Sequence, residues 1–577
     1  MCGIYGVISK EPTNLSWCLQ RLEMLEYRGY DSAGICAVCD KGFDIYKTIG
    51  YIKNLYKQVK NKKAKNVICH TRWATHGKIN KENSHPHLCE DVCIVHNGII
   101  DNYTSLRSEF GLKEKLLSDC DSEIISCLIN RQILKYGRSV TNIIDALCLL
   151  DGSYALLIQD KENQQHIYGA KNKSPLYIGK TSNGYIFSSD LITFQGIANK
   201  YYELEDGEVF DATADEIVFY NLYKIKIQKQ LKDFENIDFS SSLGEYSCFL
   251  EKEINDIPQA LCNTYYNYYN SSNKLPCLTN YKTLHLIACG TAYHSALMGK
   301  YIIEKHLKLP CHCHIASEFL YQDCLEKNHA LFIFISQSGE TFDTLQCVKK
   351  ANELGFDTLA ITNTQHSQII KLCDYFLPIY AGKEVSVAST KVYNCTILAF
   401  YYLCKIKNIQ IDAKLISKII KDNSEQALAH LMAQTEKVVF IGKCEDYVSA
   451  MEGSLKFREL TYKNSIAYPC GELKHGTLSI IDTNSLVIAV LTNIKYLQAI
   501  STALCEVRSR GGKTAIITSL NVHSEIADIV LHIEKSDAMP LELYSIIPMQ
   551  KLALYSCQIL HLDPDKPRNL AKSVTVQ

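Results

Sequence analysis

The chain has 577 residues, with 61 lysine and arginine side chains against 62 aspartate and glutamate side chains, and 47% of its residues are apolar. At about 100–200 residues per domain, this length predicts three or four domains with room for buried cores. The near-zero net charge provides no global field for nucleic acid or an anionic membrane surface, so a charged substrate must be met by local groups.

Cysteine is unusually common, with 25 residues. A disulfide framework would require an oxidising compartment, but the N-terminal segment MCGIYGVISKEP lacks the basic and apolar regions of a secretory signal. No apolar run approaches the roughly 18 residues of a membrane span, and the longest, 395–404, suits a buried helix. We therefore expect a cytoplasmic protein whose cysteines are reduced and mostly buried thiols.

The first 240 residues mix short strands with helices expected at 15–26 and 124–135. Turn signals separate the predicted strands and favour a layered α+β arrangement. A polar stretch at 231–246 predicts a domain boundary. The predicted strands are Val67–Cys69, Val92–His96, Tyr154–Ile158 and Tyr185–Ser188.

The rest of the chain repeats a strand–loop–helix pattern. LHLIACGT at 284–291 is matched by KVVFIGKC at 437–444, and LFIFISQS at 331–338 by LVIAVLTN at 486–493, with an offset of about 155 residues. This alternation predicts βαβ units with parallel sheets. Because SQSGET follows the strand in the first copy alone, the two copies are chemically unequal.

Polar groups with catalytic potential cluster in the N-terminal part. Removal of Met1 would give Cys2 an α-amine that can serve as base for its own thiol. In CHTRWATHG, Arg72 suits a carboxylate, and in HNGII, Asn97 and Gly98 suit an oxyanion hole. Asp121 could receive an ammonium group. Each group alone also fits core packing, surface polarity or turn chemistry.

Together with CGIYGV at the start and EYRGYDSAG at 26–34, these motifs resemble the glutaminase domain of the N-terminal-nucleophile (Ntn) amidotransferases. The resemblance implies that Cys2 attacks the amide of glutamine and that Asn97 and Gly98 stabilise the tetrahedral intermediate. It makes Trp73 a candidate gate on an ammonia passage, with plain core packing as the alternative. The residues implied to bind glutamine are Arg72, Thr75, His76, Gly98 and Asp121.

The SQSGET segment lies between a buried strand and a helix predicted to begin near Thr341. Hydroxyls and backbone N–H groups at a helix N-terminus favour an anion. Ser336, Gln337, Ser338 and Thr341 are therefore predicted to cradle a phosphate, with a serine-rich helix cap as the alternative. No Walker lysine follows, which argues against a nucleoside triphosphate.

A second polar pattern is EGSLKFRE, in which Glu452, Lys456 and Glu459 share one helical face. A solvated ion-pair face is the alternative. With EVSVASTK, CGELKHGTL and the ending KSVTVQ, the whole chain resembles the glutamine–fructose-6-phosphate aminotransferase (isomerising) family. The resemblance implies an α/β and α+β multidomain fold, in which an Ntn-type αββα glutaminase sandwich precedes two doubly wound α/β sugar-isomerase (SIS) subdomains. The implied ranges are 2–240 for the glutaminase, 241–280 for a linker, 281–425 and 426–562 for the SIS subdomains, and 563–577 for a catalytic tail.

The same resemblance implies ammonia transfer from glutamine to fructose 6-phosphate, giving glucosamine 6-phosphate and glutamate. Glu459 would move the proton between C1 and C2, Lys572 would form a Schiff base, and His475 of a neighbouring subunit would assist ring opening. It implies a homodimer or higher homo-oligomer, with no cofactor, metal, nucleic acid or membrane partner. The residues implied to bind the sugar phosphate are Thr291, Ser336, Gln337, Ser338, Thr341, Val387, Ser389, Glu452 and Lys456.

Three positions depart from the family pattern, and none removes a proposed catalytic group. Ala292 replaces a serine, which predicts weaker substrate affinity unless Thr291 compensates; Thr477 replaces a proline, and Gln577 a glutamate.

Three other functions stay open: a SIS-type isomerase or deglycase with a vestigial glutaminase half, a sugar-phosphate sensor, and a metal protein. A sensor would need a DNA-binding module, and no basic helix-turn-helix segment is evident. The motif CHCH at 311–314 invites a metal, but strand alternation sends its cysteines and histidines to opposite faces.

Overall fold

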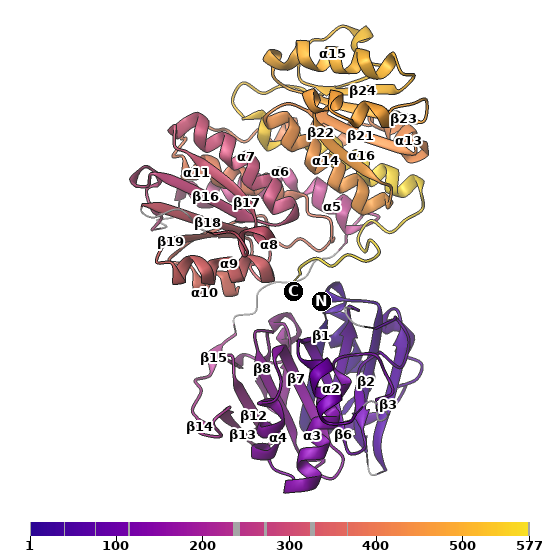
Figure 1. Cartoon of the computed structure of the whole chain (residues 1–577), viewed down its shortest axis with the longest axis vertical. Coiled ribbons are helices and arrows are strands. Elements are labelled where there is room, and N and C mark those ends of the chain that lie inside the picture. Colours follow the sequence, from indigo (N-terminus) through magenta and orange to yellow (C-terminus); the bar gives the residue numbers. More distant parts are fainter. Residues whose placement is uncertain are drawn as a thin grey trace. The chain divides into compact units, whose positions relative to one another are not determined.

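The computed structural model describes residues 2–39, 41–74, 77–112, 116–234, 243–270, 274–323, 329–365 and 367–574. The chain forms two compact units, Met1–Ser240 with Ser573–Gln577, and Ser241–Lys572 (Figure 1). We describe each unit separately.

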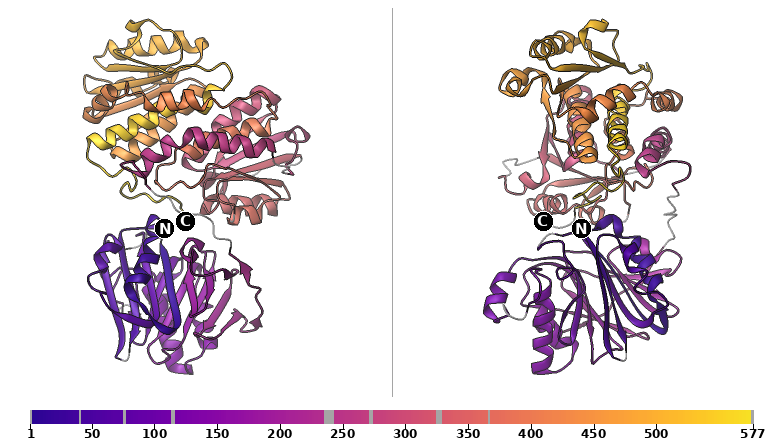
Figure 2. Two further views of the ribbon diagram at one scale, coloured as in Figure 1. Left: turned by 180° about the vertical axis from the view of Figure 1, so that it is seen from behind. Right: turned by 90° about the vertical axis from the view of Figure 1, so that its right-hand side faces the viewer.

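The N-terminal unit contains two stacked sheets with helices on the outer faces (Figure 2). The strand order is β15-β11-β9-β10-β1-β4-β2-β3 in one sheet and β14-β13-β12-β8-β7-β6-β5 in the other. The elements are β1 (Gly3–Asn14), α1 (Leu15–Glu23), β2 (Ser32–Cys39), β3 (Gly42–Ile49), β4 (Lys63–Arg72), β5 (His87–Cys89), β6 (Val92–Ile100), α2 (Tyr103–Glu109), α3 (Glu123–Tyr136), α4 (Val140–Leu147), β7 (Gly152–Asp160), β8 (Ile167–Asn172), β9 (Tyr177–Thr181), β10 (Gly184–Ser188), β11 (Lys200–Glu203), β12 (Glu208–Ala212), β13 (Ile217–Asn221), β14 (Lys226–Ile227) and β15 (Lys232–Asp233).

Alternating side chains explain these layers. On β1, Ile4 belongs to the core between the sheets, whereas Tyr5 belongs to the core under α1. On β6, Val95 faces the inner core and Ile94 packs with α3 and α4. A strand buried on both faces needs apolar residues at successive positions, as the sequence has here. The predicted αββα sandwich is confirmed, and the four predicted strands lie within β4, β6, β7 and β10.

The C-terminal unit contains two five-stranded parallel sheets of the same topology. Their strand orders are β17-β16-β18-β19-β20 and β22-β21-β23-β24-β25, so the predicted duplication is confirmed. The elements are α5 (Phe249–Asn255), α6 (Ile257–Asn270), β16 (Thr283–Ala288), α7 (Gly290–Leu307), β17 (Cys311–Ile315), α8 (Ala316–Phe319), β18 (Ala330–Ser336), α9 (Phe342–Glu353), β19 (Asp357–Thr362), α10 (Gln368–Leu372), β20 (Tyr375–Pro378), α11 (Lys391–Leu403), α12 (Ala413–Lys421), α13 (Gln426–Gln434), β21 (Lys437–Gly442), α14 (Glu445–Thr461), β22 (Ser465–Pro469), β23 (Ser485–Leu491), α15 (Leu497–Arg508), β24 (Lys513–Thr518), β25 (Ile529–His532) and α16 (Ile547–Ile559).

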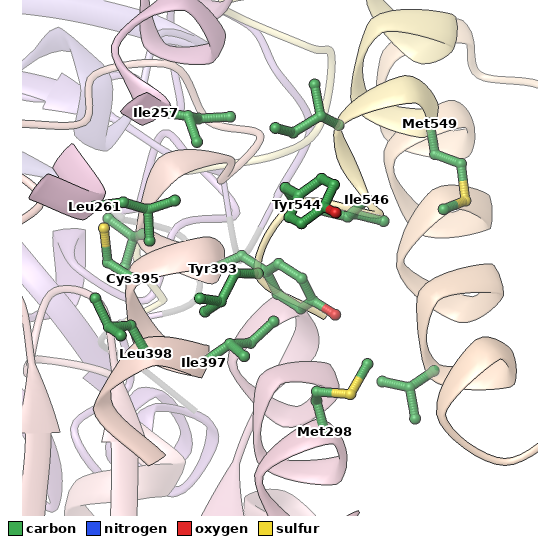
Figure 3. Packing of buried hydrophobic residues seen from close by; sticks show 14 of the residues in the cluster. Ile257, Leu261, Met298, Tyr393, Cys395, Ile397, Leu398, Tyr544, Ile546 and Met549 are labelled. Atoms are coloured by element: carbon green, nitrogen blue, oxygen red, sulfur yellow. The ribbon is translucent and has the colours of Figure 1, made fainter. Parts of the chain in front are cut away.

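One continuous core joins the two halves of this unit. Figure 3 shows Leu261 of α6, Met298 of α7, Tyr393 of α11 and Met549 of α16 in that core. The stretch predicted as a linker, 241–280, therefore contributes helices to the core of this unit. The buried helix predicted around 395–404 is α11.

The C-terminal segment is anchored by hydrogen bonds. The carboxylate of Asp565 accepts the backbone N–H groups of Phe249 and Leu250, at 2.7 and 2.8 Å, and so caps α5. The carbonyl oxygen of Asp565 also accepts the N–H of Val387 at 3.2 Å. This segment therefore holds the N-terminus of α5 to the loop before α11.

Among the described residues, no helix is long and apolar enough to cross a membrane. All cysteines within the described residues are free thiols, and more than half of them are buried.

Candidate active sites

Cys2 stands at the start of β1, next to the end of β4. Its Sγ accepts the backbone N–H of Trp73 at 3.2 Å and lies 3.5 Å from the Trp73 carbonyl oxygen. Burial raises the pKa of the Cys2 thiol, although the Trp73 N–H and the Arg72 guanidinium act in the opposite direction. The thiol is thus mainly protonated and needs a base to become a nucleophile.

The residues predicted to form the oxyanion hole lie on β6 of the seven-stranded sheet, next to Cys2. Asn97, on β6, donates its side-chain N–H to the Cys2 carbonyl oxygen at 3.0 Å. Asp121 accepts the N–H of Ile100 at 2.8 Å, which fixes the acid at the end of the same strand. Gly98 lies between them with a φ of +146°. The structure thus groups Cys2, Asn97, Gly98 and Asp121 at the seam between the sheets.

Position 98 requires glycine because the neighbouring backbone is too close for a side chain: a Cβ there would lie 1.9 Å from the Ser153 carbonyl oxygen. We expect Gly98→Ala to push β6 away from β7 and reduce glutamine hydrolysis by about 10²-fold or more. Glutamate release and thermal unfolding measure this. Gly111→Ala is the matched control, because its φ is also positive but a Cβ there meets nothing within 4 Å. Unchanged hydrolysis in Gly98→Ala would contradict the placement of Gly98 in the site.

The remaining predicted glutaminase residues follow β4. Arg72 is buried at the strand end, and Trp73 is half-buried. Thr75 and His76 lie outside the described residues. Asp31, which we did not single out within EYRGYDSAG, accepts the N–H of Ala74 at 2.8 Å. It therefore holds the backbone two residues after the end of β4.

The phosphate cradle predicted at 336–341 has the expected local form. Ser336 ends β18, and its Oγ accepts the N–H of Gly339 at 3.0 Å and lies 2.9 Å from the Thr341 hydroxyl. Helix α9 begins at Phe342, directly after Thr341, as predicted. Ser338 and Gln337 are half-buried at the same turn. Several donors therefore surround one helix N-terminus.

Buried charges converge on α14. Lys456 contacts Glu459 at 2.6 Å and Glu452 at 3.5 Å, which confirms that the three share a face. Glu452 is fully buried and also accepts the Thr291 hydroxyl at 3.0 Å. Burial lowers the pKa of Lys456, but Glu459 and Glu452 outweigh it and raise that pKa above its ordinary value. This is a buried charge network, and the solvated-face alternative is wrong.

Two further details concern α7. The Nδ1 of His294 lies 2.7 Å from Glu452 Oε2, a contact that the sequence did not indicate. Because the Thr291 hydroxyl already donates to Glu452, its hydrogen is not free to replace the serine hydroxyl missing at Ala292.

Lys572 pairs with a residue that sequence reasoning missed. Its Nζ lies 2.6 Å from Glu384 Oε2, and the lysine side chain is 6% exposed while that of Glu384 is fully buried. Glu384 also accepts the Ser389 hydroxyl and the Thr390 N–H, both at 2.8 Å. Glu384 is the first residue of the EVSVASTK motif, and this position could have identified it as a candidate from the sequence. Val387 and Ser389 thus lie on the loop that holds the Lys572 counter-charge.

His475 stands apart from these groups. It is exposed, and within the described chain no hydrogen bond joins its ring to another predicted site residue. Its proposed role from a neighbouring subunit stays a prediction.

His85, His87 and Cys120 place one potential ligand atom each within 4.8 Å of the others in the N-terminal unit. Burial lowers the pKa of both imidazoles, with Arg72 adding to the effect and Lys47 acting on His87, and burial raises the pKa of the thiol to about 12. The imidazoles are therefore neutral, as metal ligands must be, whereas the thiol would have to lose its proton to bind a cation. The expected absence of a metal stays a prediction.

The CHCH motif lies on β17 with its side chains alternating, as predicted. Cys311 belongs to the core shared by the two halves, whereas His314 packs against Phe319 on the other face of the sheet.

Comparison with known proteins agrees with a glutamine amidotransferase region followed by a SIS repeat. A SIS domain model matches residues 277–405 and 431–556, and a glutamine amidotransferase domain model matches 70–195. The glutamine–fructose-6-phosphate aminotransferases (isomerizing) of Bacillus cereus and Listeria monocytogenes are each 36% identical to this chain, over 604 and 605 residues that cover 100% of both sequences. The chain belongs to the glutamine–fructose-6-phosphate aminotransferase (isomerizing) family.

A solved structure supports the aminotransferase assignment of the C-terminal unit. The C-terminal domain of glucosamine-fructose-6-phosphate aminotransferase from Francisella tularensis matches with a TM-score of 0.51 and 30% identity, covering 56% of this chain and 100% of that one. Membership of the aminotransferase family accounts for a glutaminase half and a SIS repeat in one chain.

Proposed function

We propose that this protein transfers ammonia from glutamine to fructose 6-phosphate and isomerises the product, giving glucosamine 6-phosphate and glutamate. The observation that carries the proposal is that one chain holds both groups. Asn97 donates a hydrogen bond to Cys2 in the glutaminase half. Lys572 forms a buried ion pair with Glu384 in the half that matches the SIS model. We further propose a cytoplasmic homodimer or higher homo-oligomer, in which the exposed His475 serves the sugar site of a second copy. The other domain ranges predicted from the sequence are part of this proposal, with 241–280 assigned to the C-terminal unit instead of a linker.

In the glutaminase half, the α-amine of Cys2 takes the thiol proton and the sulfur attacks the glutamine amide carbon. The Asn97 side-chain amide and the Gly98 N–H stabilise the oxyanion. Ammonia leaves with that proton, and water then releases glutamate from the thioester. Arg72 and Asp121 hold the carboxylate and ammonium ends of the substrate; Thr75 and His76 complete this set in the proposal.

In the SIS half, the cradle of Ser336, Gln337, Ser338 and Thr341 holds the sugar phosphate. The Lys572 amine attacks the C2 carbonyl of the open-chain ketose and water leaves, forming an imine. Ammonia then displaces Lys572 at C2. Glu459 removes a proton from C1 and returns it to C2, while the O1 hydroxyl proton passes to the nitrogen at C2, which yields the amino-aldose.

The test is an assay of glutamate and glucosamine 6-phosphate together, with glutamine and fructose 6-phosphate supplied. We expect equal amounts of the two products, because each transferred ammonia leaves one glutamate. Glutamate without amino sugar would reduce the function to a glutaminase. Isomerised sugar phosphate without glutamate would instead favour the SIS-type isomerase with a vestigial glutaminase half, and binding of the sugar phosphate without turnover would favour a sensor.

A further inference from the structure

Glu253 of α5 is a buried carboxyl to which the proposed mechanism gives no role; it is 2% exposed. Its Oε1 accepts the backbone N–H groups of Val385 and Ser386, the latter at 3.3 Å. Its Oε2 is buried and has no hydrogen-bond partner within the described chain. Glu253 therefore fastens the backbone directly after Glu384.

The fastened segment, 384–389, carries several groups of the proposed sugar site. Glu384 pairs with Lys572, and Ser389 donates to Glu384 at 2.8 Å. Val387 is held from the other side by the Asp565 carbonyl oxygen. The position of the segment, and with it the Lys572 counter-charge, thus depends on two anchors, Glu253 and Asp565.

The carboxyls of Glu253 and Glu384 share this buried region with the ammonium groups of Lys572 and Lys391. Burial, then repulsion by Glu384, raises the pKa of Glu253 to about 8, while Lys572 and Lys391 act in the opposite direction. Burial also acts to raise the pKa of Glu384, but Lys572 and hydrogen bonds from Ser389 and Thr390 outweigh it, so that pKa lies below its ordinary value. Near neutral pH, Glu384 is therefore ionised and Glu253 is protonated.

The charge of Glu253 matters for Lys572. A lysine attacks a carbonyl as the neutral amine, so its ammonium must first lose a proton. A second carboxylate nearby would stabilise the ammonium by Coulomb attraction, which is strong between buried charges. A neutral Glu253 does not stabilise the Lys572 ammonium in this way, so deprotonation of Lys572 is not made harder. It still accepts the two backbone N–H groups.

We propose that Glu253 is a positioning residue of the sugar site: its carboxyl fastens the 384–389 segment through Val385 and Ser386 and so places Glu384 beside Lys572. The inference rests on the proposed function, because it assumes that Lys572 forms the imine.

The test compares wild type, Glu253→Gln and Glu253→Ala by their kcat and KM for fructose 6-phosphate, from about pH 6 to about pH 9.5. We expect wild-type kcat/KM to fall about tenfold per pH unit above about pH 8, where Glu253 ionises. Glutamine keeps an acceptor oxygen but cannot ionise, so Glu253→Gln should keep its KM within about threefold and lose this alkaline decline. Glu253→Ala removes the fastening and should raise KM by about tenfold or more.

Glu251→Gln makes the same substitution at a half-buried position of the same helix and should match the pH profile of wild type. Two results would overturn the inference: an alkaline decline in Glu253→Gln equal to that of wild type, or a wild-type KM in a folded Glu253→Ala protein.

Thermal unfolding gives a readout that does not depend on turnover. Because the pKa of Glu253 is raised on folding, its contribution to stability is fully present below its ordinary value of 4.5 and is lost as the pH rises from 4.5 to about 8. We expect the melting temperature of wild type to fall through that window relative to Glu253→Gln, and parallel curves would overturn the inference. A wild type that makes no glucosamine 6-phosphate would instead count against the proposed function.

Discussion

Replacing Cys2 by alanine is expected to abolish glutamine-dependent formation of glucosamine 6-phosphate, with a loss of about 10³-fold or more. Asn97 and Gly98 can stabilise an oxyanion, but without the sulfur no covalent intermediate forms. The interconversion of fructose 6-phosphate and glucose 6-phosphate should persist, because the groups proposed for it belong to the C-terminal unit. Separate assays of glutamate release and sugar isomerisation measure the two effects.

Cys148→Ala is the matched control for this variant. Cys148 is a free, exposed thiol in the same unit, so its removal should leave both activities unchanged. If Cys2→Ala lost both activities while remaining folded, the assignment of two separate sites would be wrong. If it kept glutamine hydrolysis, Cys2 would not be the nucleophile.

Local patterns made much of the fold predictable. The apolar runs Val92–His96 and Tyr154–Ile158 indicated strands that the structure places in β6 and β7, and the 284–291 and 437–444 segments revealed the repeat. The two helices within 241–280 were missed, although Leu250, Ile254, Ile257 and Leu261 recur at intervals of four, three and four residues. The polar stretch just before them, which marks the boundary, obscured this helical period.

The sugar site was predictable only where its residues share a local motif. Ser336 and Thr341 lie on one turn, and Lys456 and Glu459 lie on one helix. Glu384, by contrast, meets Lys572 at a sequence separation of 188 residues, and it does so because Asp565 ties the C-terminal segment to α5. No periodicity encodes such a contact, since it arises from tertiary packing.

Replacing Lys572 by alanine should abolish both isomerisation and amino-sugar formation, by about 10³-fold or more, because no imine can form. It should also destabilise the C-terminal unit by about 3–5 kcal/mol, since it leaves Glu384 buried without its counter-charge. Glutamine hydrolysis measured without sugar should survive. Lys535→Ala, which removes an exposed lysine of the same unit, is the control and should change neither activity nor stability.

Lys572→Arg separates the two effects. Arginine keeps the positive charge beside Glu384 but cannot form an imine, so we expect near wild-type stability with no isomerisation.

The pH dependence of unfolding gives an independent check on the Lys572–Glu384 pair. In wild type the pKa of Glu384 is lowered on folding, so its stabilising contribution is present above its ordinary value of 4.5 and is lost as the pH falls through the lowered folded value. In Lys572→Ala, burial dominates and the pKa of Glu384 should rise above 4.5, so the variant should lose stability relative to wild type as the pH increases from about 4 to about 8. Adding Glu384→Gln to Lys572→Ala should restore much of that loss, because the unpaired charge is gone. A loss that is independent of pH would show that Lys572 does not act as the counter-charge of Glu384. Activity retained in Lys572→Arg would show that Lys572 does not form the imine.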